Sequence, residues 1–220
     1  MFENIHFIKP GDIEGQSMAI IEETLLQKYR DKEALMHHFT EEELAVVKRC
    51  IHTSADFDYA DNLCFSEDAC QKGMAALGQG AHIVTDTTMA AAGINKRALS
   101  AFGGQVHCFI GDADVAKEAS QKGITRSAVS MERAADLHVP LIFAIGNAPT
   151  ALLRLYELME EGRIRPALVI GVPVGFVNVV ESKEIMMQTK APYIIARGRK
   201  GGSNIAAAIC NALLYRTDKR

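Results

Sequence analysis

The sequence predicts an α/β fold: a Rossmann-like three-layer α/β/α sandwich with a mostly parallel sheet, preceded by N-terminal helices. From residue 81 onward, short apolar runs alternate with helical segments, which is the pattern of parallel strands joined by right-handed helical crossovers. The runs are almost continuously apolar, as is typical of strands that helices cover on both faces. Before residue 81 the apolar residues recur mainly at helical spacing.

Two N-terminal helices are predicted. In residues 14–30 the apolar side chains fall on one stripe of a helix. Thr40, followed three residues later by Glu43, forms a capping box, in which the hydroxyl accepts from the amide of Glu43 and the carboxylate reaches back. A helix is therefore expected from about residue 41 to about residue 54.

Five strands are expected in the remainder of the chain. They are residues 81–85, 105–110, 139–145, 166–171 and 191–196. No linker, repeat or low-complexity segment interrupts the sequence, and 220 residues are compatible with one large domain. Residues 1–220 are therefore predicted to form a single domain.

Composition excludes several classes of function. The chain has no Trp and 6% aromatic residues, which argues against a stacking platform for single-stranded nucleic acid. It has no apolar run long enough to span a bilayer, so neither a nucleic acid nor a membrane is expected as partner. The N-terminus lacks the apolar segment of a signal peptide, and the five cysteines are odd in number, without a CxxC pair. A cytoplasmic protein with free thiols and no zinc is therefore expected.

Charge is distributed unevenly along the chain. Residues 1–70 hold 15 acidic and 6 basic residues, whereas residues 71–220 hold 12 acidic and 18 basic residues. The basic part indicates an anionic ligand, although a mixed solvated surface would give the same numbers.

Four loops follow predicted strands and carry residues that packing alone does not require: 86–88, 146–150, 172–176 and 197–203. Because ligands bind at the carboxyl ends of parallel strands, these loops are expected to share one ligand-binding edge. Their predicted binding residues are Asp86, Asn147, Thr150, Gly175, Phe176, Arg197, Gly201 and Ser203.

Each loop residue also has a plainer interpretation. The glycines could make tight turns, Asp86 and Ser203 could be N-caps, and Pro149 suits the first turn of a helix. The basic loop 197–203 could simply be solvated.

A second candidate anion site is the predicted helix that begins after Thr125. Thr125 can cap this helix, so Arg126, Ser127 and the free amides of its first turn would hold a carboxylate. Alternatively, Arg126 is an ordinary surface cation near a cap.

Motifs for cofactors, metals and nucleophiles are missing. The sequence contains no G-x-G-x-x-G, P-loop, H-x-x-x-H or G-x-S-x-G motif, so no cofactor and no metal are expected. The remaining candidate acid is His52, which lies at the predicted end of a helix three residues after Arg49. Alternatively, His52 is a helix-end residue that the helix dipole favours.

Five segments carry a resemblance to a known family: "IHTSADFDY" (51–59), "GITRSA" (123–128), "GNAPTAL" (146–152), "GVPVGFVNVVESK" (171–183) and "RGRKGGS" (197–203). From about residue 5 to about residue 215, the chain resembles the precorrin-8X methylmutase family, also called cobalt-precorrin-8 methylmutase, of cobalamin (corrin) biosynthesis. The resemblance implies an isomerase that moves a methyl group from C-11 to C-12 of the tetrapyrrole. It also implies a homodimer, with the substrate site near the subunit interface and no separate cofactor.

The resemblance also implies roles for individual residues. It assigns catalysis to His52 and substrate contacts to Ser17, Arg49 and Arg126. Some relatives have Ala-Cys-Gly after the histidine, where this chain has Thr53-Ser54-Ala55. The segment after His52 resembles the cobalt-using relatives more, but whether the substrate carries cobalt stays open.

The implied substrate explains why such residues would be needed. A flat macrocycle fringed with carboxylates needs apolar walls and a rim of cations and amides, and Val172, Val174 and Phe176 are expected to form walls. A methyl shift needs no nucleophile, but a histidine that lends a proton to the ring would polarise it.

Two alternative functions remain from the sequence. One is a non-catalytic carrier that binds the corrinoid product, and the other is a nucleotide-binding Rossmann-like enzyme. Hand-off of the product to an amidating synthase is a further expectation about partners.

Overall fold

A computed structural model describes residues 9–217. The prediction that the N-terminus is not a signal peptide falls partly on residues 1–8, which lie outside the described residues. The strands are β1 (Leu63–Phe65), β2 (His82–Thr85), β3 (Val106–His107), β4 (Leu141–Ile145), β5 (Leu168–Gly171) and β6 (Tyr193–Ala196).

The helices precede, separate and follow these strands. They are a 3-10 turn (Pro10–Asp12), α1 (Ile13–Tyr29), α2 (Lys32–His38), α3 (Glu41–Ser54), α4 (Tyr59–Asn62), α5 (Ala69–Gly78), α6 (Thr88–Gly93), α7 (Lys96–Ala101), α8 (Ala113–Lys122), α9 (Arg126–Ala135), α10 (Pro149–Glu160), α11 (Val179–Met187) and α12 (Ser203–Thr217).

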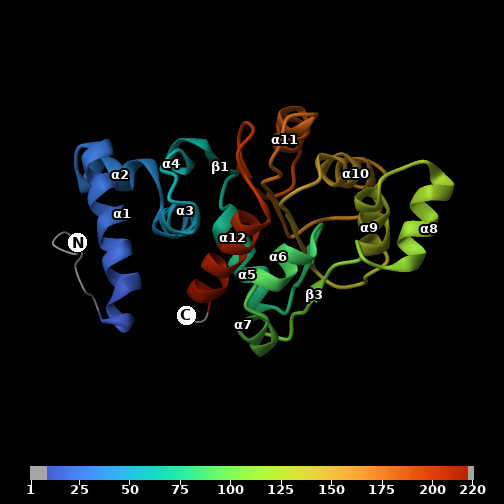
Figure 1. Ribbon diagram of the computed structural model, residues 1–220, viewed down its shortest axis with the longest axis horizontal. Coiled ribbons are helices and arrows are strands. Elements are labelled where there is room, and N and C mark those ends of the chain that lie inside the picture. The colour runs from blue at the N-terminus through green and yellow to red at the C-terminus, as the bar shows by residue number, and fades with distance from the viewer. Residues whose placement is uncertain (1–8, 218–220) are drawn as a thin grey trace, which may run out of the picture.

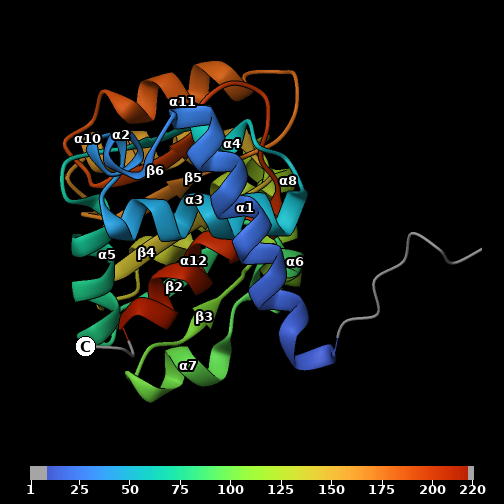
Figure 2. The same ribbon diagram turned by 90° about the vertical axis from the view of Figure 1, so that its left-hand side faces the viewer.

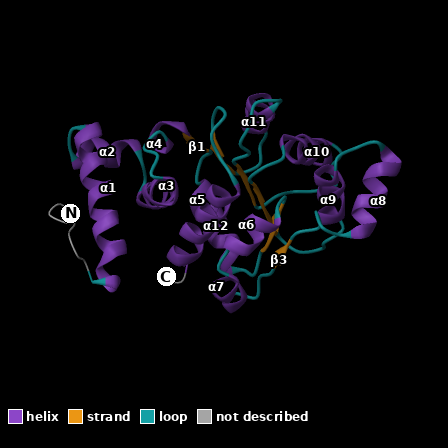
Figure 3. Cartoon of the chain, in the orientation of Figure 1, coloured by secondary structure: helices purple, strands orange, loops and turns teal. Residues whose placement is uncertain are grey.

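The strands form one mostly parallel sheet, in the order β1-β6-β5-β4-β2-β3. Neighbours from β3 to β6 are parallel, and β1 pairs with β6 in the antiparallel direction. Figure 3 shows the sheet as the middle layer, with helices on both sides. The predicted fold class is therefore confirmed, and all five predicted strands are present, although β3 is much shorter than residues 105–110.

Strand β1 was not expected, because residues 63–65 lie in a part of the sequence that reads as helical. Three residues are too few to show a period of two. The strand forms because its backbone pairs with β6, Leu63 opposite Ala196.

Alternating side chains of the strands face two separate cores. Ile142 and Ala144 of β4 pack with α3, α5 and α12, whereas Leu141, Phe143 and Ile145 pack with α9 and α10. Figure 1 shows α5, α6 and α12 on one side of the sheet and α9 and α10 on the other. Burial on both faces explains why the strands are apolar throughout.

The N-terminal helices form an additional layer outside α12. The predicted capping box begins α3: the Thr40 hydroxyl accepts from the Glu43 amide at 3.2 Å, and the Glu43 carboxylate accepts from the Thr40 amide at 2.9 Å. Helix α1 lies across α3 (Figure 2) and buries Ile21 and Leu25. The predicted helix bounds of 14–30 and 41–54 are confirmed to within one residue.

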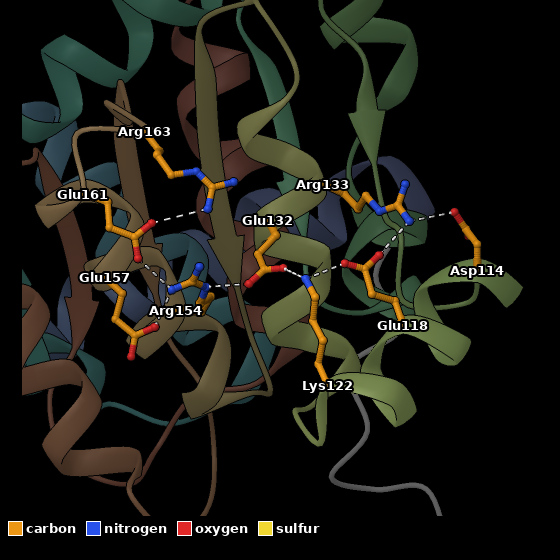
Figure 4. Close-up of polar contacts among 9 residues, drawn as sticks. All are labelled: Asp114, Glu118, Lys122, Glu132, Arg133, Arg154, Glu157, Glu161 and Arg163. Carbon is orange, nitrogen blue, oxygen red and sulfur yellow. Dashed lines mark hydrogen bonds and ion pairs between the residues drawn. The ribbon is translucent and has the colours of Figure 1, made fainter.

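On the opposite side of the molecule, a network of ion pairs joins α8, α9 and α10 (Figure 4). At its centre, Glu132 binds Lys122 at 2.7 Å and Arg154 at 2.9 Å. Arg154 also binds Glu157 at 2.7 Å. These helices bury Met131, Leu152 and Leu155, so the ion pairs close the rim of an apolar contact.

Between residues 9 and 217, no helix combines the length and the apolar composition that crossing a membrane requires. In the same part of the chain, no group of three or more potential ligands gathers as a metal site would require.

Candidate functional site

The four predicted loops share one edge of the sheet. Strands β2, β4, β5 and β6 are parallel neighbours in register, so the loops after them leave from the same edge. Because β1 is antiparallel and its first residue pairs with the last residue of β6, the segment before β1 reaches this edge too. That segment, residues 55–62, follows the helix that carries His52.

Asp86 bridges the loops after β2 and β4. Its buried carboxylate accepts hydrogen bonds from the amides of Gly146 at 2.8 Å, Asn147 at 2.8 Å and Ala148 at 2.6 Å. Burial raises the pKa of Asp86, and the three amides act in the opposite direction. Asp86 is not an N-cap, because it is the Thr87 hydroxyl that accepts from Ala90 and caps α6.

This arrangement fills the crevice in which a nucleotide would bind. Strand order reverses between β2 and β4, and such a switch point is the usual nucleotide site of doubly wound sheets. Here the amides that could hold a phosphate are bound by Asp86. The geometry therefore argues against the nucleotide-binding alternative.

The loop after β4 packs closely against the start of α12. A Cβ atom on Gly146 would lie 2.6 Å from the Cα atom of Ser203, so the glycine is required by close approach. The Ser203 hydroxyl lies 2.8 Å from that of Thr87. Asn147, the next residue of this loop, is exposed.

The predicted anion site at α9 has the expected cap. The Thr125 hydroxyl accepts from the amide of Ala128 at 3.2 Å and donates to the Thr150 hydroxyl at 2.9 Å. Arg126, the first residue of α9, is exposed, whereas Ser127 is buried. Pro149 begins α10, as its predicted position in a first turn requires.

The loops after β5 and β6 lie against each other. The amide of Gly202 donates to the carbonyl oxygen of Val172 at 2.9 Å, and a Cβ atom on Gly201 would lie 2.1 Å from that oxygen. The expectation that Val172 lines the ligand is wrong, because this close packing buries it completely. Phe176 and Val174 remain available, with 84% and 48% of their surface exposed.

Two cations of the loop 197–203 are already paired. Arg197 binds both carboxylate oxygens of Glu184, at 2.7 and 3.1 Å. Lys200 binds Asp56 and Asp58, each at 2.6 Å. The contacts of Lys200 with Asp56 and Asp58 tie the segment after α3 to the edge of the sheet.

His52 is exposed in the last turn of α3. The helix ends because Ala55 adopts the left-handed conformation, with φ 55°, and its amide donates to the carbonyl oxygen of Ile51. His52 lines a hollow of about 300 Å³ between α1 and α3. The other residues of its lining are Ser17, Ile20, Ile21, Ile51, Ala55 and Phe57.

The structure brings Ser17 to His52 but directs Arg49 elsewhere. The Arg49 guanidinium binds Glu14 at 2.9 Å and lies 5.7 Å from the ring centre of Tyr215. It lines two other hollows, of about 390 and 320 Å³, that lie on the α12 side of α3. The three-residue spacing of Arg49 and His52 on α3 therefore did not determine which neighbours each side chain would contact.

Lys183 is a residue of this edge that the sequence did not single out. It is fully buried in α11, and its ammonium donates to the carbonyl oxygens of Gly198 at 2.8 Å and Lys200 at 2.9 Å. Burial lowers the pKa of Lys183 to about 8. Because it follows the polar residues Glu181 and Ser182, Lys183 is expected from the sequence to be an ordinary surface lysine. No local pattern indicates that it is buried.

A larger hollow, of about 770 Å³, lies at the opposite edge of the sheet. It is lined by residues at the ends of α10 and α11 and before β5 and β6, among them Tyr156, Arg165 and Lys190. It contains none of the predicted site residues, and amino-end edges of parallel sheets are not the usual ligand sites.

Comparison with known proteins gives a consistent result. A family model described as precorrin-8X methylmutase matches residues 12–216. The cobalt-precorrin-8 methylmutase of Salmonella typhimurium is 45% identical over 215 residues, which cover 96% of this chain and 98% of that protein. That of Priestia megaterium is 42% identical over 211 residues, or 96% of this chain and 90% of the relative.

A solved structure agrees with these relatives. The crystal structure of precorrin-8x methyl mutase from Thermus thermophilus superposes with a TM-score of 0.82 at 35% sequence identity, covering 94% of this chain and 98% of that one.

Proposed function

This chain belongs to the precorrin-8X methylmutase family, and on that premise we propose that it moves a methyl group from C-11 to C-12 of precorrin-8 or its cobalt form. The product would be hydrogenobyrinic acid or cobyrinic acid. The methylmutases of this family are isomerases of cobalamin biosynthesis, and this chain is such an enzyme. The relatives' names give no support to the non-catalytic carrier.

His52 is the proposed proton donor. The observation that carries this assignment is its exposed position in a hollow whose other side chains, Ile20, Ile51 and Phe57 among them, are mainly apolar. A proton lent to the conjugated ring polarises it, the bond from C-11 to the methyl carbon breaks as the bond to C-12 forms, and the proton returns to the imidazole. Such general acid catalysis typically contributes ~10²–10⁴ in rate.

The rim of the substrate would be held by polar groups. Ser17 lies in the same hollow as His52, and Arg126 is exposed at the N-terminus of α9. Arg49 is proposed to release Glu14, its present partner, and to bind a substrate carboxylate instead.

We also propose that the enzyme is a homodimer whose second subunit completes the site. The hollow beside His52, at about 300 Å³, is at the small end of the range for ligand pockets, roughly 300–1,000 Å³. Ile20, Phe176 and Val177 are 62%, 84% and 78% exposed, which supports a further covering surface. Light scattering on the eluting protein would give twice the chain mass, and a single-chain mass would contradict the dimer.

A cytoplasmic location and hand-off of the product to an amidating synthase belong to the same proposal. Buried free thiols, such as Cys50, Cys70 and Cys210, suit a reducing compartment. Hand-off predicts that product leaves the enzyme faster when the synthase is added, and an unchanged release rate would contradict it.

The visible spectrum of the ring tests the function directly. Purified enzyme mixed with precorrin-8 or cobalt-precorrin-8 is expected to shift the spectrum to that of the product. His52→Ala should slow turnover at least ~100-fold and leave product affinity within about threefold. His138→Ala, which removes an exposed histidine far along the chain, is the matched control.

Three outcomes would contradict parts of this proposal. If the wild type changes neither substrate, the methylmutase function fails. If it binds the product tightly without turnover, the protein is a carrier. If His52→Ala turns over as fast as the wild type, the assigned proton donor is wrong.

A further inference from the structure

We propose that Arg199, supported by the ring of Phe176 and held in position by the buried Lys183, binds a peripheral carboxylate of the macrocycle. The proposal rests on the methylmutase function above and gives roles to two residues that lie within the quoted segments 171–183 and 197–203 but to which the sequence assigned no role. Arg199 would be a binding residue, and Lys183 a positioning residue that acts through it.

The first argument is that Arg199 is available when its neighbours are not. Arg197 donates through Nε and Nη2 to the two carboxylate oxygens of Glu184, and Lys200 is bound by two aspartates. Within residues 9–217, no carboxylate lies within ion-pair distance of Arg199. A bidentate guanidinium is the side chain best suited to a carboxylate, and in this loop only that of Arg199 is unoccupied among the described residues.

The second argument is the surface beside it. The Arg199 guanidinium carbon lies 6.0 Å from the ring centre of Phe176, within reach of a cation–π contact. Phe176 is 84% exposed and its neighbour Val177 78% exposed. A cation next to an uncovered apolar surface matches a ligand with a flat apolar face and an acidic rim.

The third argument is that the backbone on both sides of Arg199 is fixed. Lys183 donates to the carbonyl oxygens of Gly198 and Lys200, the residues that flank Arg199. The carbonyl oxygen of Arg199 itself accepts from the amide of Gly175 at 3.2 Å. Three consecutive carbonyl groups are therefore held, and the guanidinium is presented from a fixed backbone.

Lys183 is an unusual residue for this purpose. Its side chain is fully buried, and within the described residues its ammonium binds carbonyl oxygens rather than a carboxylate. A buried charge without a counter-ion is unfavourable, so packing alone would favour an apolar side chain here. Fixing the loop gives a reason for the charge.

Product binding separates this role from a general effect on the fold. Cobyrinic acid, which carries free carboxylates, and its heptamethyl ester, which carries none, are titrated into each variant and followed by their visible spectra. Arg199→Met should weaken binding of the acid about ten- to hundredfold and change binding of the ester by less than about threefold. Arg165→Met, which removes an exposed arginine at the opposite edge of the sheet, should match the wild type.

Comparison of the two arginines tests the choice of Arg199. Arg197→Met should cost less affinity for the acid than Arg199→Met, because Glu184 already occupies Arg197. An equal or larger loss in Arg197→Met, or wild-type affinity in Arg199→Met, would overturn the proposal. An equal loss for acid and ester would overturn it too, because the contact would then not involve the charge.

A double-mutant cycle tests the positioning role of Lys183. Lys183→Met should weaken acid binding nearly as much as Arg199→Met, and the double variant should be no weaker than the worse single variant by more than about threefold. If the affinity loss of the double variant equals the product of the losses of the two single variants, the two residues are not coupled and the positioning role is wrong. If Lys183→Met does not fold, Lys183→Gln, which keeps a hydrogen-bond donor, is used in its place. Lys183→Arg, which keeps the charge, should bind the acid more tightly than Lys183→Met does.

Kinetics distinguish failure of this inference from failure of the proposed function. With substrate, Arg199→Met should raise KM and leave kcat within about threefold, whereas His52→Ala should lower kcat. If the wild type neither binds nor converts the corrinoid, the proposed function is wrong. If the wild type does both and Arg199→Met is indistinguishable from it, this inference alone is wrong.

Discussion

Single residues at the carboxyl edge of the sheet carry charges in unusual surroundings. Lys183 of α11 is the clearest case, since its side chain is buried and its ammonium binds two backbone carbonyl oxygens. Lys200 differs from it because carboxylates from the segment after α3 bind it. The cations of this edge are thus set by tertiary contacts rather than by their neighbours in sequence.

The burial of Lys183 predicts an unusual dependence of stability on pH. Its pKa is about 8 in the folded protein, against 10.5 for an ordinary lysine. Between these values the unfolded chain binds more protons, so the contribution of Lys183 to the free energy of unfolding rises with pH. The rise is on the order of 3 kcal/mol over the whole window.

Urea unfolding of the wild type and Lys183→Met measures this contribution. The difference in their free energies of unfolding should move in favour of the wild type between about pH 8 and about pH 10. Other groups titrate in both proteins and cancel in the difference. A difference that stays constant over this range would show that Lys183 is not buried as a charge.

At the scale of elements, the prediction from sequence succeeded where local signals were strong. The capping box placed the start of α3, and the apolar runs placed five strands. It failed for β1, whose three residues take their conformation from β6. The direction of Arg49 and the burial of Val172 could not be predicted either, because both depend on packing between elements distant in the chain.

The network in Figure 4 makes a prediction about helices α8 to α10. Glu132→Gln is expected to lower the free energy of unfolding by about 1 kcal/mol, because Glu132 binds Lys122 and Arg154 with 16% of its side chain exposed. Glu157→Gln, at a partner of Arg154 that is 56% exposed, should cost about half as much or less. Equal losses would contradict the central role of Glu132.

The same glutamate predicts how salt and acid act on this layer. Burial alone would raise the pKa of Glu132, but the contacts with Lys122 and Arg154 lower it below its ordinary value of 4.5. The stabilisation is therefore present above that value and is lost as the pH falls through the folded pKa. High salt should also shrink the difference between wild type and Glu132→Gln.

At the scale of the whole molecule, two cores on either side of one sheet determine which groups solvent can reach. Cys50, Cys70 and Cys210 are buried in the core that α3, α5 and α12 form. Burial raises the pKa of Cys70 and of Cys210 to about 12. Cys64 and Cys108 are partly exposed.

Thiol titration tests this distribution. In the native protein, a thiol reagent such as DTNB should modify Cys64 and Cys108 within minutes and the three buried thiols only after unfolding. The double variant Cys64→Ser, Cys108→Ser should show no fast reaction. Fast modification of a third thiol would mean that the core of α3, α5 and α12 opens readily.

Most of the proposed site could be inferred from the sequence as a set of loops, but not as a set of contacts. The loops share an edge because the strands are parallel, which the alternation of apolar runs with helical segments predicts. Whether a polar residue faces ligand or protein was not predictable: Asp86 binds three amides, whereas Arg199 has no carboxylate partner within residues 9–217.

The contact between Asp86 and the loop after β4 has a consequence for chemical rescue. Asp86→Ala would leave the amides of Gly146, Asn147 and Ala148 converging on an empty space the size of a small carboxylate. Added formate should then raise the melting temperature of this variant by several degrees more than that of the wild type, since it binds the folded form alone. Acetate should act more weakly because of its methyl group, and an equal response of both proteins to formate would mean that the loop collapses once its internal anion is removed.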